Sequence, residues 1–137
     1  MIFKIKSFTL IEIIIVIIII GILAALAVNQ YTPARERAVS REAVSTLRLV
    51  AAAERIYRME IGGFYPPVAL SPVTTPKDIN DNLKVSVNEN NWDYSISSTA
   101  INNFTSLADR LGTGGFLDCQ YSIDELNAEN HTADCLQ

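Results

Sequence analysis

The chain opens with a long block of apolar residues. Eight consecutive β-branched residues occupy 13–20, and over the whole of 8–28 only Thr9, Glu12 and Gly21 interrupt the apolar pattern. An α-helix rises about 1.5 Å per residue, so 21 residues reach roughly 30 Å, the thickness of a bilayer's hydrocarbon core. The pattern therefore predicts an apolar helix that is long enough to span a membrane.

The next stretch, 34–60, continues as an amphipathic helix. It is rich in alanine, it contains no glycine or proline after Pro33, and Gly62-Gly63 ends it. Glu54 and Arg58 are spaced as an i,i+4 ion pair. Apolar residues recur at helical spacing on two adjoining stripes, namely Val39, Ala43, Leu47, Val50 and Tyr57, and Leu49, Ala52, Ile56 and Met59. We expect one helix of about 50 residues, half of which needs partners outside the chain.

The C-terminal part changes to a strand pattern after a proline-rich segment. Residues 66–82 hold four prolines and no periodicity, and are expected to form an irregular loop. Alternating or apolar runs predict short strands at 83–87, 92–97, 104–108 and 116–121. Residues 122–125 fit the start of a final helical turn. The expected fold class is α+β, with the second half of the long helix packed on a small antiparallel sheet.

Glu12 is the informative residue of the apolar block, because a carboxylate inside a membrane segment costs about 2.5–3.5 kcal/mol. Three interpretations stand side by side. Ala25-Leu26-Ala27 after the basic start at Lys4 and Lys6 is typical of a cleaved secretory signal. The block is also long enough for a plain membrane anchor. In the third, it belongs to a filament subunit whose helix packs against other copies.

The sequence from Ser7 to Glu12, followed by the apolar run, closely resembles the class III signal of type IV pilins and type II secretion pseudopilins. The resemblance implies that a membrane prepilin peptidase cuts between Ser7 and Phe8 and methylates the new amine. Serine replaces the glycine that usually precedes the cut. Glu12 is implied to pair with the free amine of a neighbouring subunit, which aligns the incoming copy. Opposite charges attract strongly where the dielectric is low, so assembly would neutralise Glu12.

The resemblance also implies the organisation and partners of the chain. Residues 1–7 would be the leader, 8–31 the membrane or filament-core segment, 32–61 the amphipathic helix, and 62–137 the globular head. The partners would be further copies in a helical filament, the peptidase and an inner-membrane assembly platform. The N-terminus would be cytoplasmic before assembly. We expect a structural subunit of a type IV pilus-like filament, a secretion pseudopilin as the alternative, and a non-polymerising anchored or secreted binding protein as the competing class.

Composition and charge argue against several classes of function. The chain has 137 residues, a net charge of −4 and a pI near 4.9, which argues against nucleic acid as a partner. One histidine, His131, and two cysteines are too few for a closed zinc site. His131 is expected to be solvated in a polar loop. No motif for catalysis or a cofactor is present, so no enzymatic activity and no cofactor are expected.

The charges are unevenly distributed. Residues 30–59 carry six arginines against three glutamates, whereas 60–137 carry three basic against eleven acidic side chains. Most of these arginines fall within about one third of the helix circumference. The candidates for a contact with the acidic part of another subunit are Arg37, Arg41, Arg48 and Arg55. A solvated helix face is the alternative.

The two cysteines, Cys119 and Cys135, lie near the end of a chain that starts with a membrane-targeted segment. That context favours a disulfide formed outside the cytoplasm, with free buried thiols as the alternative. A cysteine pair that encloses the last stretch of chain is also similar to the type IV pilin pattern. Acidic side chains of the same region, Asp118, Asp124 and Glu125, are weak candidates for calcium ligands, and a solvated acidic loop is the simpler interpretation.

Overall fold

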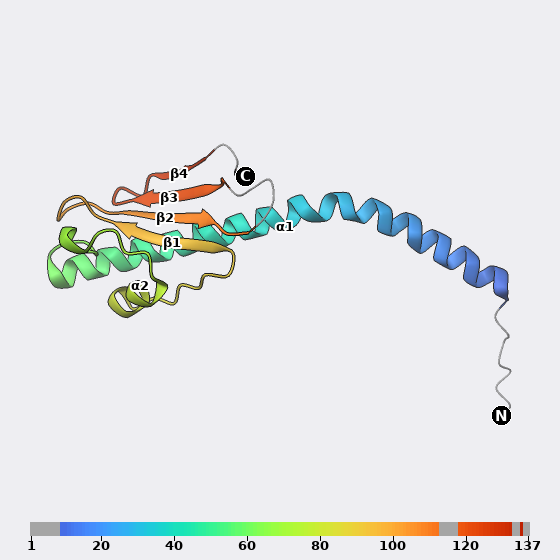
Figure 1. The fold of residues 1–137 in the computed structure, drawn as a ribbon, viewed down its shortest axis with the longest axis horizontal. Helices are drawn as coiled ribbons and strands as arrows, with labels where there is room; N and C mark the ends of the chain where they lie inside the picture. Colours follow the sequence, from blue (N-terminus) through green and yellow to red (C-terminus); the bar gives the residue numbers. More distant parts are fainter. Residues whose placement is uncertain (1–8, 113–117, 133–134, 136–137) are drawn as a thin grey trace, which may run out of the picture. The chain divides into compact units, whose positions relative to one another are not determined.

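A computed structural model describes residues 9–112, 118–132 and 135. One long helix is followed by a short helical turn, a second helix and four strands. These are α1 (Leu10–Ile61), η1 (Val68–Leu70), α2 (Pro76–Leu83), β1 (Trp92–Ser97), β2 (Thr105–Arg110), β3 (Gln120–Asp124) and β4 (Glu129–His131). The strands form one antiparallel sheet in the order β1-β2-β3-β4, as Figure 1 shows. The predicted α+β class is confirmed.

The chain divides into two compact units between Glu36 and Arg37. The second unit, hereafter the head, holds the whole hydrophobic core. Its part of α1 contributes the stripe from Val39 to Val50, and inward-facing side chains of the sheet alternate with partly exposed ones along β1. This alternation has the two-residue period that a sheet requires when one face is covered by a helix. The sheet therefore lies on α1 through one apolar face (Figure 1).

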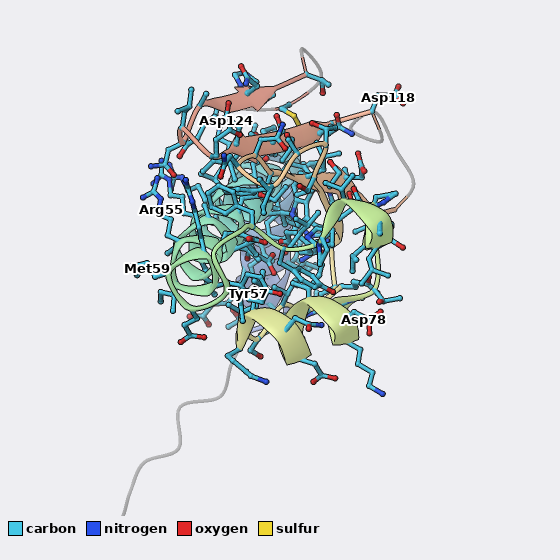
Figure 2. All side chains as sticks on the ribbon, turned by 90° about the vertical axis from the view of Figure 1, so that its left-hand side faces the viewer. Arg55, Tyr57, Met59, Asp78, Asp118 and Asp124 are labelled. Carbon is cyan, nitrogen blue, oxygen red and sulfur yellow. A yellow bond between two sulfur atoms is a disulfide. The ribbon has the colours of Figure 1, made fainter. Side chains whose placement is uncertain are left out.

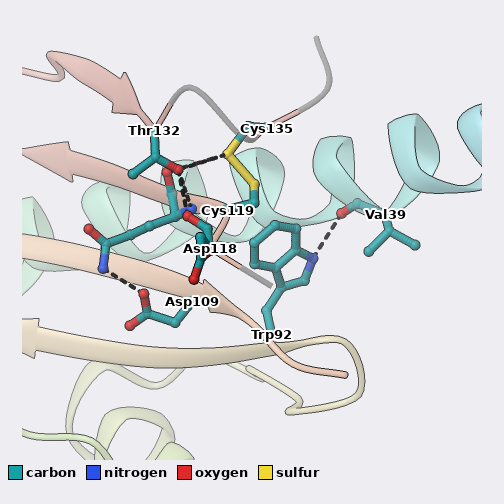
Figure 3. The surroundings of a disulfide bond; sticks show 8 residues. Val39, Trp92, Asp109, Asp118, Cys119, Thr132 and Cys135 are labelled. Carbon is teal, nitrogen blue, oxygen red and sulfur yellow. Dashed lines mark hydrogen bonds between the residues drawn. A yellow bond between two sulfur atoms is a disulfide. The ribbon is translucent and has the colours of Figure 1, made fainter. Parts of the chain in front are cut away.

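Trp92 fixes the end of the sheet to the helix. Its indole Nε1–H donates a hydrogen bond to the Val39 carbonyl at 2.9 Å, drawn in Figure 3, and its side chain is 1 % exposed. The Arg110 guanidinium lies 5.5 Å from the centre of the Trp92 ring. A buried indole needs a partner for its N–H, and here that partner is a backbone carbonyl of α1. This hydrogen bond therefore holds the start of β1 against the first turn of α1 within the head.

The segment between α1 and the sheet corrects two predictions. The expected strand at 83–87 is wrong, because Leu83 ends helix α2 and Lys84 takes a left-handed φ of 56°. The irregular loop expected at 66–82 is wrong over its second part, where α2 forms. Pro76 stands at the first position of this helix, where its missing N–H costs nothing, and Ile79 and Leu83 are buried one turn apart. The high proline content predicted a loop at a place where the amphipathic helix α2 forms.

The end of the sheet corrects a third prediction. No helical turn starts at Ser122, since β3 runs on to Asp124. The Asp124 carboxylate instead accepts hydrogen bonds from the backbone N–H groups of Leu126 and Ala128, at 2.9 and 2.8 Å. This acidic side chain stabilises the turn that leads into β4, which the sequence pattern did not predict. The strand expected at 116–121 begins outside the described residues and is found as β3.

Candidate functional site

Glu12 lies in the first turn of α1, where it faces back toward the start of the helix. The Thr9 backbone N–H and Oγ1 lie 3.5 and 3.4 Å from Glu12 Oε2. A threonine followed three residues later by glutamate is a capping box, a signal that the sequence analysis overlooked. The predicted cleavage position between Ser7 and Phe8 lies outside the described residues. Within the described chain, Glu12 therefore has only a long, local contact.

The described residues of the first unit do not cover the helix around Glu12. Every described side chain from Thr9 to Leu26 is exposed, and the large apolar ones are 41–78 % exposed. Apolar surface of this extent is unfavourable in water and marks a segment that contacts lipid or another chain. No single helix of the described residues is long and apolar enough to cross a membrane, while one bent pair, Leu10–Leu26 with Tyr31–Ile61, meets the criteria of length and composition.

The structure divides the predicted arginine stripe into paired and unpaired members. Arg48 Nε donates to Glu129 Oε1 at 2.6 Å and its Nη2 donates to Oε2 at 3.1 Å, which links α1 to β4. The hydrogen bond to Arg48 lowers the pKa of Glu129, and the reciprocal bond raises that of Arg48. Arg37, Arg41 and Arg55 are exposed, and none of them has an acidic partner among the described residues.

The predicted disulfide is present between Cys119 and Cys135, with both residues buried. Figure 3 shows Thr132 beside it. The Thr132 hydroxyl accepts from the Gln120 N–H at 3.0 Å and donates to the Asp118 carbonyl at 2.8 Å. The covalent bond and these hydrogen bonds hold the chain after β4 against the start of β3.

The weak metal candidates are not brought together. Asp118, Asp124 and Glu125 all belong to the described residues, and no group of three metal-ligating side chains occurs there. Asp124 is engaged by backbone N–H groups instead. His131 is exposed as expected, but it lies in β4 rather than in a loop, with its ring stacked 5.9 Å from that of Tyr121.

Glu54 is a buried carboxylate in the head, whereas its spacing to Arg58 predicts an ion pair. It is 0 % exposed and does not pair with Arg58, whose guanidinium lies 4.8 Å from the centre of the Phe64 ring. Glu54 Oε2 accepts the Tyr65 backbone N–H at 2.8 Å, while Oε1 has no hydrogen-bond partner among the described residues. Burial raises the pKa of Glu54 to about 8, partly offset by the bond from Tyr65. Only the tertiary fold produces this environment, since the spacing to Arg58 indicates a surface pair.

One comparison with known proteins found a match. Residues 2–28 match the family model described as the prokaryotic N-terminal methylation motif, which is the signal of type IV pilins and pseudopilins. No curated protein and no solved structure matched the chain. The motif implies processing by a prepilin peptidase and a precursor anchored in the inner membrane. It covers the segment that contains Glu12 and the start of the exposed apolar helix.

Proposed function

We propose, from the premise that this chain carries the signal of type IV pilins and pseudopilins, that it is a structural subunit of a type IV pilus-like filament. The precursor is inserted in the inner membrane with its N-terminus in the cytoplasm. It is cut before Phe8 and then polymerises through the apolar part of α1. The head lies outside the filament core. The role is mechanical rather than catalytic.

The observation that carries this proposal is the position of Glu12 within an exposed apolar helix. Among the described residues its side chain contacts only Thr9, at long distance, and the described apolar residues around it are uncovered. A carboxylate costs least in such a place when a cation neutralises it there. The amine that cleavage creates on a neighbouring copy supplies that cation. Association then buries the apolar surface and neutralises the charge in a single step.

A secretion pseudopilin is the second candidate, and two features of the head bear on it. The turn Gly63-Phe64-Tyr65-Pro66 after α1 is similar to pseudopilins and some pilins. The disulfide between Cys119 and Cys135 favours the pilus, because pseudopilins more often lack it. Both candidates share the cleavage and the role of Glu12, so the experiments below test what they have in common. A non-polymerising anchored or secreted binding protein is the outcome that would replace both.

N-terminal analysis of the mature protein tests the processing step. Mass spectrometry of the protein isolated from membranes should find Phe8 as the first residue, with a methylated amine. The apolar segment then stays in the mature chain. A first residue at Val28 would show a cleaved secretory signal, and the filament proposal would be abandoned.

The substitution Glu12→Ala tests the role of the carboxylate. It should leave membrane insertion intact and abolish or greatly slow polymerisation, measured as sedimentable filaments. Thr9→Ala is the matched control, because it removes the hydroxyl contact of Glu12, keeps the backbone one and spares the charge. If Thr9→Ala blocks assembly as strongly as Glu12→Ala, helix capping explains the effect. Normal filaments from Glu12→Ala would refute the assigned role.

A further inference from the structure

A basic groove runs along one flank of the head. Its one wall is the face of α1 from Arg37 to Arg48, and Tyr121 of β3 lines the other. Ser40 and Ser45 supply hydroxyl groups between the arginines. Such a concave surface with several guanidinium groups fits a ligand that presents carboxylates, because guanidinium binds carboxylate oxygens in a planar fork.

The charge of the groove is only partly neutralised within the chain. Arg48, at one end, is paired with Glu129 in a two-point contact. Arg37 and Arg41 have no acidic partner in the part of the chain that the structure describes. Two cations therefore remain available at the end of the groove nearer the start of the head.

An acidic strip is made of Asp93 and Asp109 on the outer face of the sheet and Glu89 in the segment that leads into β1. Asp93 of β1 and Asp109 of β2 are directly opposite each other in the strand register. The Glu89 carboxyl lies against that of Asp93, and desolvation together with this neighbour raises the pKa of Glu89. Among the described residues no salt bridge reaches the strip. The Gln120 amide donates a hydrogen bond to Asp109 but carries no charge. Like charges directly opposite on paired strands are destabilising, so a cation from outside the chain would stabilise the strip.

The two surfaces lie at the same level of the head but on different flanks. The hydrogen bond from Trp92 to Val39 holds the start of β1, next to Asp93, beside the turn of α1 that carries Arg37 and Arg41. The groove lies near the sheet edge where Arg48 bonds Glu129 of β4, whereas Asp93 and Asp109 lie on β1 and β2, toward the opposite edge. Figure 2 looks onto the head with Arg55 of α1 on one flank and Asp118, which precedes β3, on the other. A copy placed alongside, with little shift along α1, therefore presents acid to base.

We infer that copies lying side by side meet through these surfaces, with the basic groove of one copy receiving the acidic strip of its neighbour. The inference rests on the proposed function and names the head surfaces that the filament uses. The contact joins two different patches, so each copy keeps one patch free for the next. Such a heterologous contact propagates into an open assembly instead of closing as a two-fold dimer. Contacts between opposite charges set the register of neighbouring copies and speed their association more than they raise the affinity.

A cysteine pair in the full chain tests the geometry directly. Arg41→Cys combined with Asp93→Cys, oxidised after assembly, should give a ladder of covalent multimers on a non-reducing gel. Each single variant should give no ladder. The matched control is Arg55→Cys with Asp81→Cys, which uses exposed positions outside both surfaces. A ladder from the control pair alone, or dimers only from the test pair, would overturn the inference.

Charge reversal tests the energetics in the same filaments. Arg41→Glu and Asp93→Arg should each reduce the yield of sedimentable filaments about fivefold, and the double variant should restore it, because the charges are exchanged and not lost. Arg55→Glu is the control and should have no such effect. Equal yields from wild type, both single variants and the double variant would refute the contact while leaving the filament proposal intact. Absence of filaments from wild type would refute the filament proposal itself.

Discussion

At the scale of single residues, Glu54 and Glu12 are the same residue type in two different environments, one buried and one exposed. Glu54 is enclosed by the head, with one oxygen bonded by Tyr65 and the other without a partner in the residues that the structure describes. Glu12 is exposed on an apolar helix and, in the part of the chain that the structure describes, has a local contact only. Burial alone favours the neutral acid, while an apolar surface without cover favours a charged partner from outside. Glu54 thus bears on the stability of the head, and under the proposed function Glu12 bears on assembly.

The stability of the head is expected to fall as the pH rises between about 4.5 and 8. The pKa of Glu54 is about 8 in the folded chain against a usual 4.5, so across this window the folded state binds more protons than the unfolded state. The free energy of unfolding then decreases by up to about 1.4 kcal/mol per pH unit. Denaturant unfolding followed by Trp92 fluorescence, at a series of pH values, measures this slope.

The substitution Glu54→Gln should remove most of that pH dependence, because the amide keeps an oxygen for the Tyr65 N–H and does not titrate. Glu60→Gln is the matched control, since Glu60 is exposed on the same helix. It should leave the slope unchanged. If wild type and Glu54→Gln show the same slope, another group is responsible for the pH dependence.

At the scale of elements, α1 shows what periodicity predicts and what it does not. Both predicted stripes are apolar, yet Val39, Leu47 and Val50 are buried by the sheet, whereas Ile56 and Met59 are 55 and 79 % exposed. The spacing identifies a helix and its apolar faces. Which face the sheet covers depends on where the chain after Gly63 returns.

The disulfide acts at the same scale, on β3 and β4. Replacing Cys119 and Cys135 together by serine should lower the free energy of unfolding of the head by about 3 kcal/mol, because the bond closes a loop of this length in the unfolded chain. Hydrogen exchange of the β4 amides should also accelerate. Reduction of the wild-type protein should reproduce both effects. Unchanged denaturation midpoints would show that the hydrogen bonds of Thr132 suffice to hold this segment.

At the scale of the whole molecule, the chain combines one unit with a core and one without. All the buried apolar residues of the core lie in the head, between Val39 and Cys135. The described part of the first unit up to Leu26 is entirely exposed. The apolar surface of the first unit is therefore left for lipid or another chain to cover, while the head carries its own source of stability.

A fragment of residues 37–137 should therefore fold on its own, with its disulfide intact. It should unfold cooperatively by Trp92 fluorescence, migrate as a monomer in gel filtration and show no affinity for lipid vesicles, because the apolar segment is absent. The full chain should partition into the same vesicles. Non-cooperative unfolding of the fragment would show that the first unit contributes to the head's stability.

The sequence alone determined the features that depend on residues close together in the chain. These are the long helix, the alternating strand at 92–97 and the prepilin-type motif around Glu12. Their signals are local periodicity and short spacing, which are properties of the chain before it folds. The disulfide was predicted from the membrane-targeted start of the chain, which implies an oxidising compartment for the cysteines.

Only the tertiary structure decided the burial of Glu54, the pairing of Arg48 with Glu129 and the alignment of Asp93 with Asp109. The last two join residues on different elements, and the first depends on which segment covers the end of α1. Local spacing carries no information on such neighbours, because packing and register are set only when the sheet closes on the helix. The burial and pairing of charged groups in the head therefore depend on the fold. The placement of Glu12 within an apolar helix follows from the sequence alone.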